Sequence, residues 1–364
     1  MKELYTKLNY VQNVGTIIYR IMNNKPFIVA EMSGNHNQSL MRALKIVEAA
    51  ANCGVDAIKI QTYMPDSMTL NIADKKGFFI DDENNLWYGK TSYEIYQEAA
   101  TPYEWHKPIF DRCDELGIVG FSTPFDFEGV EFLERLNCPI YKIASAEMID
   151  IPLLKCLAKT KKPVIMSTGM SNLDEIKEAV KTLKDNGCND LTLLKCTTSY
   201  PANVKDSNLL TIPDLQKHFP DCEVGLSDHT LGIGAAIASI ALGATLIEKH
   251  FTLSRADGGV DSAFSMEPAE MKQLVDECKN AYLALGKVNY DLSEDEKIYV
   301  NFRRSLYIVK DIKKGEKFTA ENIRSIRPGY GLHTRYYEEV LEKVATKNLK
   351  FGEPLKLEDF ENDL

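Results

Sequence analysis

The segment GLSDHTLGIGAAIASIALGATLIEKHFTL, residues 225–253, contains two short apolar runs separated by a stretch rich in Ala and Gly. His229 follows the first apolar run and His250 ends the second. Apolar runs of this length predict strands, and the stretch between them predicts a helix. The segment therefore indicates a strand, a helix and a second strand, with one imidazole at the end of each strand.

The same unit recurs along most of the chain. Helical stretches such as 39–54 and 172–187 open on a capping residue and close on Gly. The apolar runs do not alternate with polar residues, which is typical of a parallel sheet covered by helices on its outer face. The predicted strands are residues 27–33, 57–63, 118–124, 140–145, 163–168, 191–197, 223–228 and 245–250.

Eight strands alternating with helices predict an α/β fold, a (β/α)8 TIM barrel, followed by a small C-terminal domain. An open doubly wound sheet is the alternative, but no Gly-rich dinucleotide loop follows the first strand. We expect an N-terminal extension at 1–24, the barrel at 25–286, a charged linker at 287–303 and the small domain at 304–364. The long segment 64–106 is expected to form part of the active-site mouth.

The composition argues against two classes of protein, those that bind nucleic acids and those that span a membrane. With 43 basic and 53 acidic residues, the formal charge is −10, which argues against a nucleic-acid partner. No run of eighteen apolar residues is present, so we expect no membrane span. The eight cysteines form no CxxC pair and predict buried free thiols in a reducing cytoplasm.

Polar side chains stand at the ends of nearly all predicted strands, where TIM barrels place their chemistry. About half of such Ser and Thr residues would only cap helices. Lys59 and Lys142 are harder to explain this way, because each lies among apolar residues, where an unpaired charge is costly. Either an acidic partner or a bound anion must compensate. We favour an anion, a phosphate or a phosphate plus a carboxylate, because two lysines converge with several hydroxyls.

A lone histidine at a strand end is more often a hydrogen-bonded structural residue than a ligand. His229 and His250, however, end neighbouring strands on the same side of the barrel and can lie close enough to share a metal. Two imidazoles without a cysteine suit a divalent ion such as Mn²⁺ or Zn²⁺, with positions left open for water or substrate. This predicts a Lewis-acid site.

An ordered series of motifs carries a family resemblance. Residues 30–63 (AEMSGNHNQSLMRALKIVEAAANCGVDAIKIQTY), FSTPFD, YKIASAEMIDIPLL, MSTGM, LKCTTSYP, GLSDHT and ATLIEKHFTL together resemble the sialic acid synthase family. The segment RSLYIVKDIKKGE with the later RPGYGL resembles the antifreeze-like (SAF) domain of these enzymes. The match runs from residue 25 to 361 and implies condensation of phosphoenolpyruvate with an amino-sugar acceptor.

Within this family, DAIKIQTYMPDSMTL and LWYGKTSYEIYQEAATPYEWH are most similar to the pseudaminic acid synthase branch. That branch implies 2,4-diacetamido-2,4,6-trideoxy-L-altrose as the acceptor, with phosphate released by C–O cleavage. N-acetylneuraminate and legionaminate synthases are the alternatives. The resemblance also implies a divalent metal cofactor (Mn²⁺, Mg²⁺ or Co²⁺) and a domain-swapped homodimer.

The resemblance assigns roles to individual residues. Those expected to take part in the reaction are Glu31, Lys59, Lys142, His229 and His250, the two histidines as metal ligands. Those expected to bind phosphoenolpyruvate are Lys59, Gln61, Thr123, Lys142, Ser145, Ser167, Tyr200 and Ser227. Those expected to face the acceptor are Glu147, Asp261 and, from the SAF domain of a second copy, Arg327. Thr198 stands where the family often has Asn.

Two other classes of protein are alternatives to a synthase. A metal-dependent hydrolase on a barrel would use the same histidines, but it usually needs more ligands, and it leaves the paired lysines unexplained. A binding or structural protein would use the SAF-like segment for carbohydrate or ice, and it leaves the polar strand ends without a purpose.

Overall fold

A computed structural model describes residues 26–360 of the 364-residue chain. The predicted N-terminal extension, 1–24, lies outside the described residues. Two compact units divide between Gly286 and Lys287, and each is described by itself.

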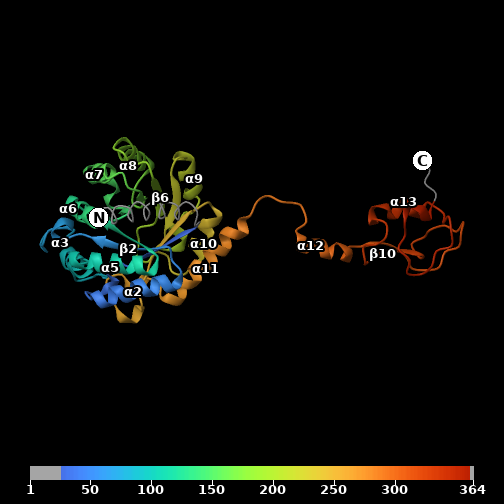
Figure 1. Ribbon diagram of the computed structural model, residues 1–364, viewed down its shortest axis with the longest axis horizontal. Helices are drawn as coiled ribbons and strands as arrows, with labels where there is room; N and C mark the ends of the chain where they lie inside the picture. Colours follow the sequence, from blue (N-terminus) through green and yellow to red (C-terminus); the bar gives the residue numbers. More distant parts are fainter. Residues whose placement is uncertain (1–25, 361–364) are drawn as a thin grey trace, which may run out of the picture. The chain divides into compact units, whose positions relative to one another are not determined.

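The first unit is a closed barrel of eight parallel strands in sequence order, β1 to β8, with β8 pairing back to β1 (Figure 1). This confirms the predicted TIM-barrel fold and excludes the open doubly wound sheet. Each strand lies within two residues of its predicted bounds. The strands are β1 Phe27–Glu31, β2 Ala57–Thr62, β3 Val119–Pro124, β4 Tyr141–Ile143, β5 Val164–Ser167, β6 Leu191–Cys196, β7 Glu223–Ser227 and β8 Leu246–His250.

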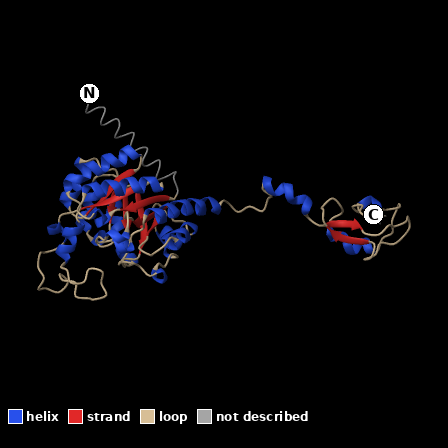
Figure 2. Cartoon of the chain, turned by 90° about the horizontal axis from the view of Figure 1, so that it is seen from below, coloured by secondary structure: helices blue, strands red, loops and turns tan. Residues whose placement is uncertain are grey.

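Helices surround the strands on the outside of the barrel (Figure 2). Several of them follow a residue whose side chain caps the helix, as Ser39, Asp126, Asp150 and Asn172 do. They are α2 Leu40–Cys53, α3 Pro65–Met68, α4 Ser92–Ala99, α5 Tyr103–Leu116, α6 Phe127–Arg135, α7 Ile151–Lys159, α8 Leu173–Asp185, α9 Thr211–His218, α10 Gly234–Ala241 and α11 Pro268–Leu285.

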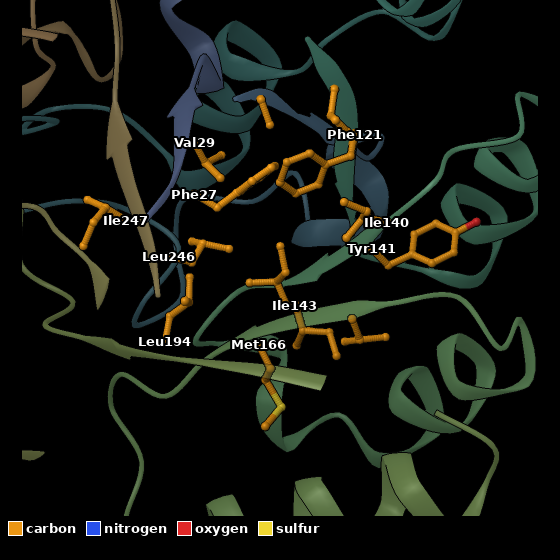
Figure 3. Close-up of a cluster of buried hydrophobic side chains, with 14 of the residues drawn as sticks. Phe27, Val29, Phe121, Ile140, Tyr141, Ile143, Met166, Leu194, Leu246 and Ile247 are labelled. Atoms are coloured by element: carbon orange, nitrogen blue, oxygen red, sulfur yellow. The ribbon is translucent and has the colours of Figure 1, made fainter. Parts of the chain in front are cut away.

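The barrel core is apolar at one end and polar at the other. Phe27, Phe121 and Leu246 come from three different strands and are fully or almost fully buried (Figure 3). The register places Phe27 beside Leu246 and, four residues further along the same strands, Glu31 beside His250. Each strand therefore passes from an apolar layer to a layer of charged side chains at the C-terminal end, where the candidate site lies.

The connection between β2 and α5 forms two short helices, α3 and α4, and an irregular stretch pinned by an antiparallel bridge between Phe79 and Thr91. Thr91 and Glu94 form a capping box at the start of α4. The segment therefore has a defined conformation, and several of its side chains reach the cavity described below.

The second unit contains an antiparallel pair, β9 Ser305–Ile308 with β10 Ile323–Ile326, followed by the helix α13 Tyr337–Leu341. Its own core is built by Leu306, Phe318, Ile323 and Leu355. Helix α12, Glu294–Tyr299, occupies part of the segment predicted to be a plain linker. Ser293 and Glu296 form its capping box, a local signal that explains why this charged segment is helical.

All eight cysteines are free, and all except the partly exposed Cys156 are buried, as the sequence predicts. Over residues 26–360, no helix has the length and apolar character needed to span a lipid bilayer.

Candidate active site

A cavity of about 340 Å³ opens at the C-terminal end of the barrel. Its walls come from strand ends and from the segment between β2 and α5, which contributes Met68, Ile80, Trp87 and Ile95. The predicted site residues that line it are Glu31, Lys59, Gln61, Lys142, Ser145, Glu147, Ser167, Tyr200, Ser227, His229, His250 and Asp261. Thr198, which replaces the Asn common in the family, lines it as well.

Two predicted site residues do not line this cavity. Thr123 lies directly behind Lys59, whose ammonium donates a hydrogen bond to the Thr123 hydroxyl at 3.3 Å. Arg327 belongs to the second unit, where it is exposed just after β10.

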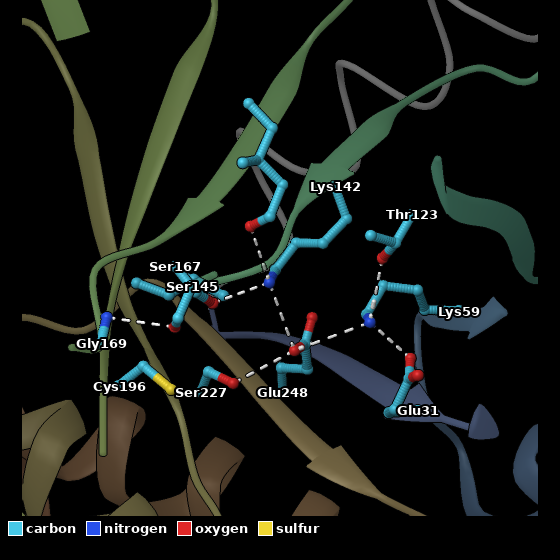
Figure 4. A network of polar contacts seen from close by, with 12 residues as sticks. Glu31, Lys59, Thr123, Lys142, Ser145, Ser167, Gly169, Cys196, Ser227 and Glu248 are labelled. Carbon is cyan, nitrogen blue, oxygen red and sulfur yellow. Dashed lines mark hydrogen bonds and ion pairs between the residues drawn. The ribbon is translucent and has the colours of Figure 1, made fainter. Parts of the chain in front are cut away.

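The two buried lysines face carboxylates (Figure 4). Lys59 Nζ lies 2.6 Å from Glu31 Oε2, and Lys142 Nζ lies 3.6 Å from Glu248 Oε1. Lys142 also donates to the Ser167 hydroxyl at 2.7 Å. The structure therefore contains an acidic partner for both lysines, the alternative that we ranked below a bound anion.

Glu248 is the main residue that was missing from the predicted site. It lies between both lysines, 3.9 Å from Lys59 Nζ, and accepts a hydrogen bond from Ser227 at 3.1 Å. Its second oxygen, Oε2, is buried and has no hydrogen-bond partner. A buried carboxylate oxygen without a partner is costly, so Glu248 marks a place where a ligand or water completes the site. The signal in the sequence was its position two residues before His250, on the same face of β8.

Burial and pairing shift the pKa values of this cluster. Burial raises the pKa of Glu31, although Lys59 acts against it. Burial opposes the charged form of Glu248 as well, but Lys142 and Lys59 outweigh it and lower the pKa of Glu248. Burial also lowers the pKa of Lys142. Glu31 is therefore the carboxylate in this cluster that takes up a proton most readily.

The hydroxyls around Lys142 form a compact cradle. The Gly169 amide donates to the Ser145 hydroxyl at 3.1 Å. A Cβ on Gly169 would lie 2.3 Å from Thr198 Oγ1 and 2.7 Å from Ser145 Oγ, so only glycine fits this approach of backbone to side chains. The cradle combines an ammonium, hydroxyls and a close backbone, which suits a phosphate group.

His229 and His250 come together as predicted from their spacing, with ring centroids 5.3 Å apart. His229 Nδ1 lies 3.0 Å from the Thr197 carbonyl oxygen; donation there leaves Nε2 with a free lone pair. Cys196 Sγ lies 3.9 Å from the same Nδ1 and, against the effect of burial, raises the pKa of His229. Burial lowers the pKa of His250 well below its usual range.

These two histidines fit a divalent metal ion. His250 Nδ1 is buried and has no hydrogen-bond partner, which suits a metal ligand, because a neutral imidazole nitrogen binds metal through its lone pair. Among residues 26–360, no group of three or more His, Cys, Asp or Glu side chains is arranged to hold a metal. An ion here would therefore keep positions open for water or substrate.

The rest of the cavity has an apolar wall and two further carboxylates. Trp87 donates from Nε1 to the Val260 carbonyl at 2.9 Å, and its ring lies 6.1 Å from that of Tyr200. Asp261 is buried and Glu147 is partly buried, and burial raises the pKa of both carboxyl groups. Glu147 Oε2 has no hydrogen-bond partner. This part of the cavity can bind a molecule that carries both apolar groups and hydrogen-bond donors.

The structure is thus an eight-stranded parallel barrel with paired lysines and paired histidines at its C-terminal end. Comparison with known proteins identifies the family to which this barrel belongs. Residues 46–290 match the NeuB family and residues 303–361 match the SAF domain. The chain belongs to the NeuB family, and the resemblance to sialic acid synthases is confirmed.

The chain is similar to different degrees to individual members of the family. The chain is 48% identical to the pseudaminic acid synthase of Campylobacter jejuni, over 93% of this chain and 98% of that protein. It is 39% identical to the N,N'-diacetyllegionaminic acid synthase of the same species, over 91% of this chain and 99% of that protein. A crystal structure of an N-acetylneuraminic acid synthetase from Leptospira borgpetersenii, in complex with citrate, superposes with a TM-score of 0.67 at 30% identity, over 77% of this chain and 92% of that one.

Proposed function

We propose that the protein is a pseudaminic acid synthase, which joins phosphoenolpyruvate to 2,4-diacetamido-2,4,6-trideoxy-L-altrose and releases phosphate. The observation that carries this proposal is the 48% identity to the Campylobacter jejuni pseudaminic acid synthase along nearly the whole chain, against 39% to the diacetyllegionaminic acid synthase. The charged and apolar parts of the cavity support it, because one substrate is a small anion and the other carries acetyl and methyl groups.

Phosphoenolpyruvate binds in the charged part of the cavity. Its two anionic groups pair with Lys59 and Lys142, and the nearby hydroxyls and the Gln61 amide donate hydrogen bonds to them. The hydroxyls assigned to this task are those of Thr123, Ser145, Ser167 and Ser227. Tyr200 covers this region from the side of the histidines, with its ring 4.6 Å from that of His229.

Charge balance governs this binding step. The two lysines already face Glu31 and Glu248, so the cluster is close to neutral before the anion arrives. Phosphoenolpyruvate, a carboxylate joined to a phosphate monoester, adds a charge of about −3 at neutral pH. Glu31 then takes up a proton, because burial already raises its pKa and a nearby anion raises it further.

His229 and His250 would hold a divalent ion, Mn²⁺, Mg²⁺ or Co²⁺, which when bound supplies Lewis-acid polarisation of the acceptor aldehyde. The support on this chain is the unpaired, buried Nδ1 of His250 and the free lone pair on His229 Nε2.

The acceptor lies in the apolar part, where Glu147 and Asp261 accept hydrogen bonds from its N–H and O–H groups. A bond forms between C3 of phosphoenolpyruvate and the aldehyde carbon, whose oxygen takes the proton that Glu31 acquired on binding. Water adds at C2 and gives a proton to Glu31, which must be deprotonated at this stage. The C–O bond to phosphate then breaks, and Lys59 and Lys142 stabilise the departing anion.

We also propose that the protein forms a homodimer. Arg327 of a second copy would reach the acceptor. We place the protein in the cytoplasm, where its eight free thiols remain reduced.

One assay tests the proposed reaction. The protein is incubated with phosphoenolpyruvate, a divalent ion and one of three acceptors: N-acetylmannosamine, the diacetamido-altrose or the diacetamido-mannose. The nonulosonic acid and phosphate are then measured by mass spectrometry. We expect product with the altrose compound, phosphate release only when acceptor is present, and ¹⁸O from the bridging position recovered in phosphate.

Preference for N-acetylmannosamine or the manno compound would show that the proposed acceptor is wrong, but the proposed class of reaction would still hold. Phosphate release without any acceptor would favour a hydrolase instead. Mixing tests the dimer: Lys59→Ala and Arg327→Ala variants, each inactive alone, would restore part of the activity when co-refolded if each site uses residues of two copies.

A further inference from the structure

Ser33 has a backbone conformation that its residue type does not favour. Its φ is +46°, in the left-handed region, where glycine is unstrained and a serine is not. It lies two residues after Glu31, its side chain is buried, and it lines the cavity. A strained residue at a ligand cavity indicates that its side chain has a function there.

The turn around Ser33 is held by other groups. Asn35 donates from Nδ2 to the Phe251 carbonyl at 2.9 Å and to the Ser265 hydroxyl at 2.8 Å. A Cβ on Gly34 would lie 3.0 Å from Ala99, so the turn packs tightly against α4. The backbone is therefore fixed without the Ser33 hydroxyl, and the hydroxyl is free for another task.

That hydroxyl links the two parts of the cavity. It donates a hydrogen bond to Asp261 Oδ2 and accepts one from Gln61 Nε2 at 3.1 Å. Gln61 Nε2 also donates to Glu31 Oε1 at 3.0 Å, and Glu31 pairs with Lys59. A continuous chain of polar contacts thus runs from the lysine on the anion side to the aspartate on the acceptor side.

We propose that Ser33 is a positioning residue that holds the Asp261 carboxylate in place for the acceptor. The Ser33 hydroxyl donates its single proton to Oδ2 and the Gly34 amide also donates to this carboxyl group, so the carboxylate is fixed and still has lone pairs to accept from an N–H or O–H of the acceptor sugar. The same contact orients the Gln61 amide, because the hydroxyl that donates to Asp261 can only accept from Gln61. This inference rests on the proposed function, in that it assumes an amino-sugar acceptor beside Asp261.

The variant Ser33→Gly tests it, because glycine relieves the strain and removes the hydroxyl. We expect an unchanged or higher melting temperature together with a tenfold or greater loss of kcat/KM for the acceptor. The KM for phosphoenolpyruvate should change less than threefold. Lys161→Gly is the matched control: Lys161 has a φ of +59° and is exposed, so this variant should keep wild-type kinetics.

A double-mutant cycle with Asp261→Asn shows whether Ser33 acts through Asp261. We expect Ser33→Gly to cost less than threefold in the Asp261→Asn background. Equal losses in both backgrounds, or a Ser33→Gly variant with wild-type acceptor kinetics, would overturn the inference. A variant that loses stability in step with activity would show a purely structural serine. The assays use whichever acceptor the wild-type protein turns over, so an error in acceptor identity is detected separately.

Discussion

Lys249 Nζ lies 2.7 Å from Asp228 Oδ2, and both side chains are 2% exposed. Asp228 immediately precedes His229, and Lys249 immediately precedes His250. Lys249 also donates to the Thr230 carbonyl at 2.6 Å. This buried ion pair therefore connects the ends of β7 and β8, the two strands that carry the paired histidines.

Lys249→Met should destabilise the protein by about 3–5 kcal/mol, because it leaves the Asp228 carboxylate buried without its partner. Urea unfolding measures the change. Lys272→Met is the matched control: Lys272 pairs with Asp276 at 2.5 Å, but both side chains are about half exposed, so the cost should be about 0–1 kcal/mol. Equal costs for the two variants would contradict this account of the buried pair.

Phosphoenolpyruvate binding should take up a proton near neutral pH. The incoming anion raises the pKa of Glu31, which burial already places above its usual range. Calorimetric titrations in Tris and in PIPES should therefore give different apparent enthalpies, and the affinity should rise as the pH falls toward 6. Glu31→Gln should reduce this buffer dependence. Identical enthalpies in the two buffers for the wild-type protein would exclude proton uptake.

Stability should fall as the pH drops below about 6.5, the usual pKa of histidine in an unfolded chain. Burial lowers the pKa of both His36 and His106 to about 4. Between these values the unfolded chain binds protons that the folded chain does not, which favours unfolding. At about 1.4 kcal/mol per pKa unit, each histidine accounts for a loss of about 2 kcal/mol between pH 7 and 5.

Urea unfolding at pH 7, 6 and 5 measures this loss. His106→Gln should reduce the pH dependence, because it removes one of the two histidines whose pKa burial lowers. A His106→Gln variant with the wild-type pH dependence would show that His106 is not the group responsible.

Removal of metal should abolish turnover. We expect chelation to stop the reaction and added Mn²⁺, Mg²⁺ or Co²⁺ to restore it. His229→Ala and His250→Ala should retain no metal after dialysis, as measured by elemental analysis, and should lose a factor of about 10²–10³ or more in rate. His218→Ala should bind metal normally. Turnover that survives stringent chelation would refute the Lewis-acid role.

The barrel could be predicted because its signals are local. Each strand is a short run of apolar residues, and helices such as α2 and α8 open on a capping residue and close near a glycine. The location of the predicted site followed from the same pattern, since the C-terminal ends of parallel strands meet at one end of a barrel, whereas the roles of individual residues came from the family resemblance. This rule alone predicted that His229 and His250 lie close together.

Other features depend on contacts between segments far apart in the chain. In the sequence, Glu248 is one of many polar residues at strand ends, and nothing local distinguishes it. It lies between Lys59 and Lys142 because the inward faces of β2, β4 and β8 meet inside the barrel. The apolar wall of the cavity needed the folded path of the segment after β2, whose side chains have no periodic pattern that would predict it.

The sequence by itself determined the barrel, the family and the side of the barrel on which the chemistry lies, because these depend on periodicity, capping and ordered motifs that are written along the chain. Only the tertiary structure decided that the lysines have carboxylate partners and that Ser33 joins Gln61 to Asp261 across the cavity. The physical reason is that pairing of buried charges and strain at a single φ angle depend on distances in space, which closure of the barrel sets and local sequence does not.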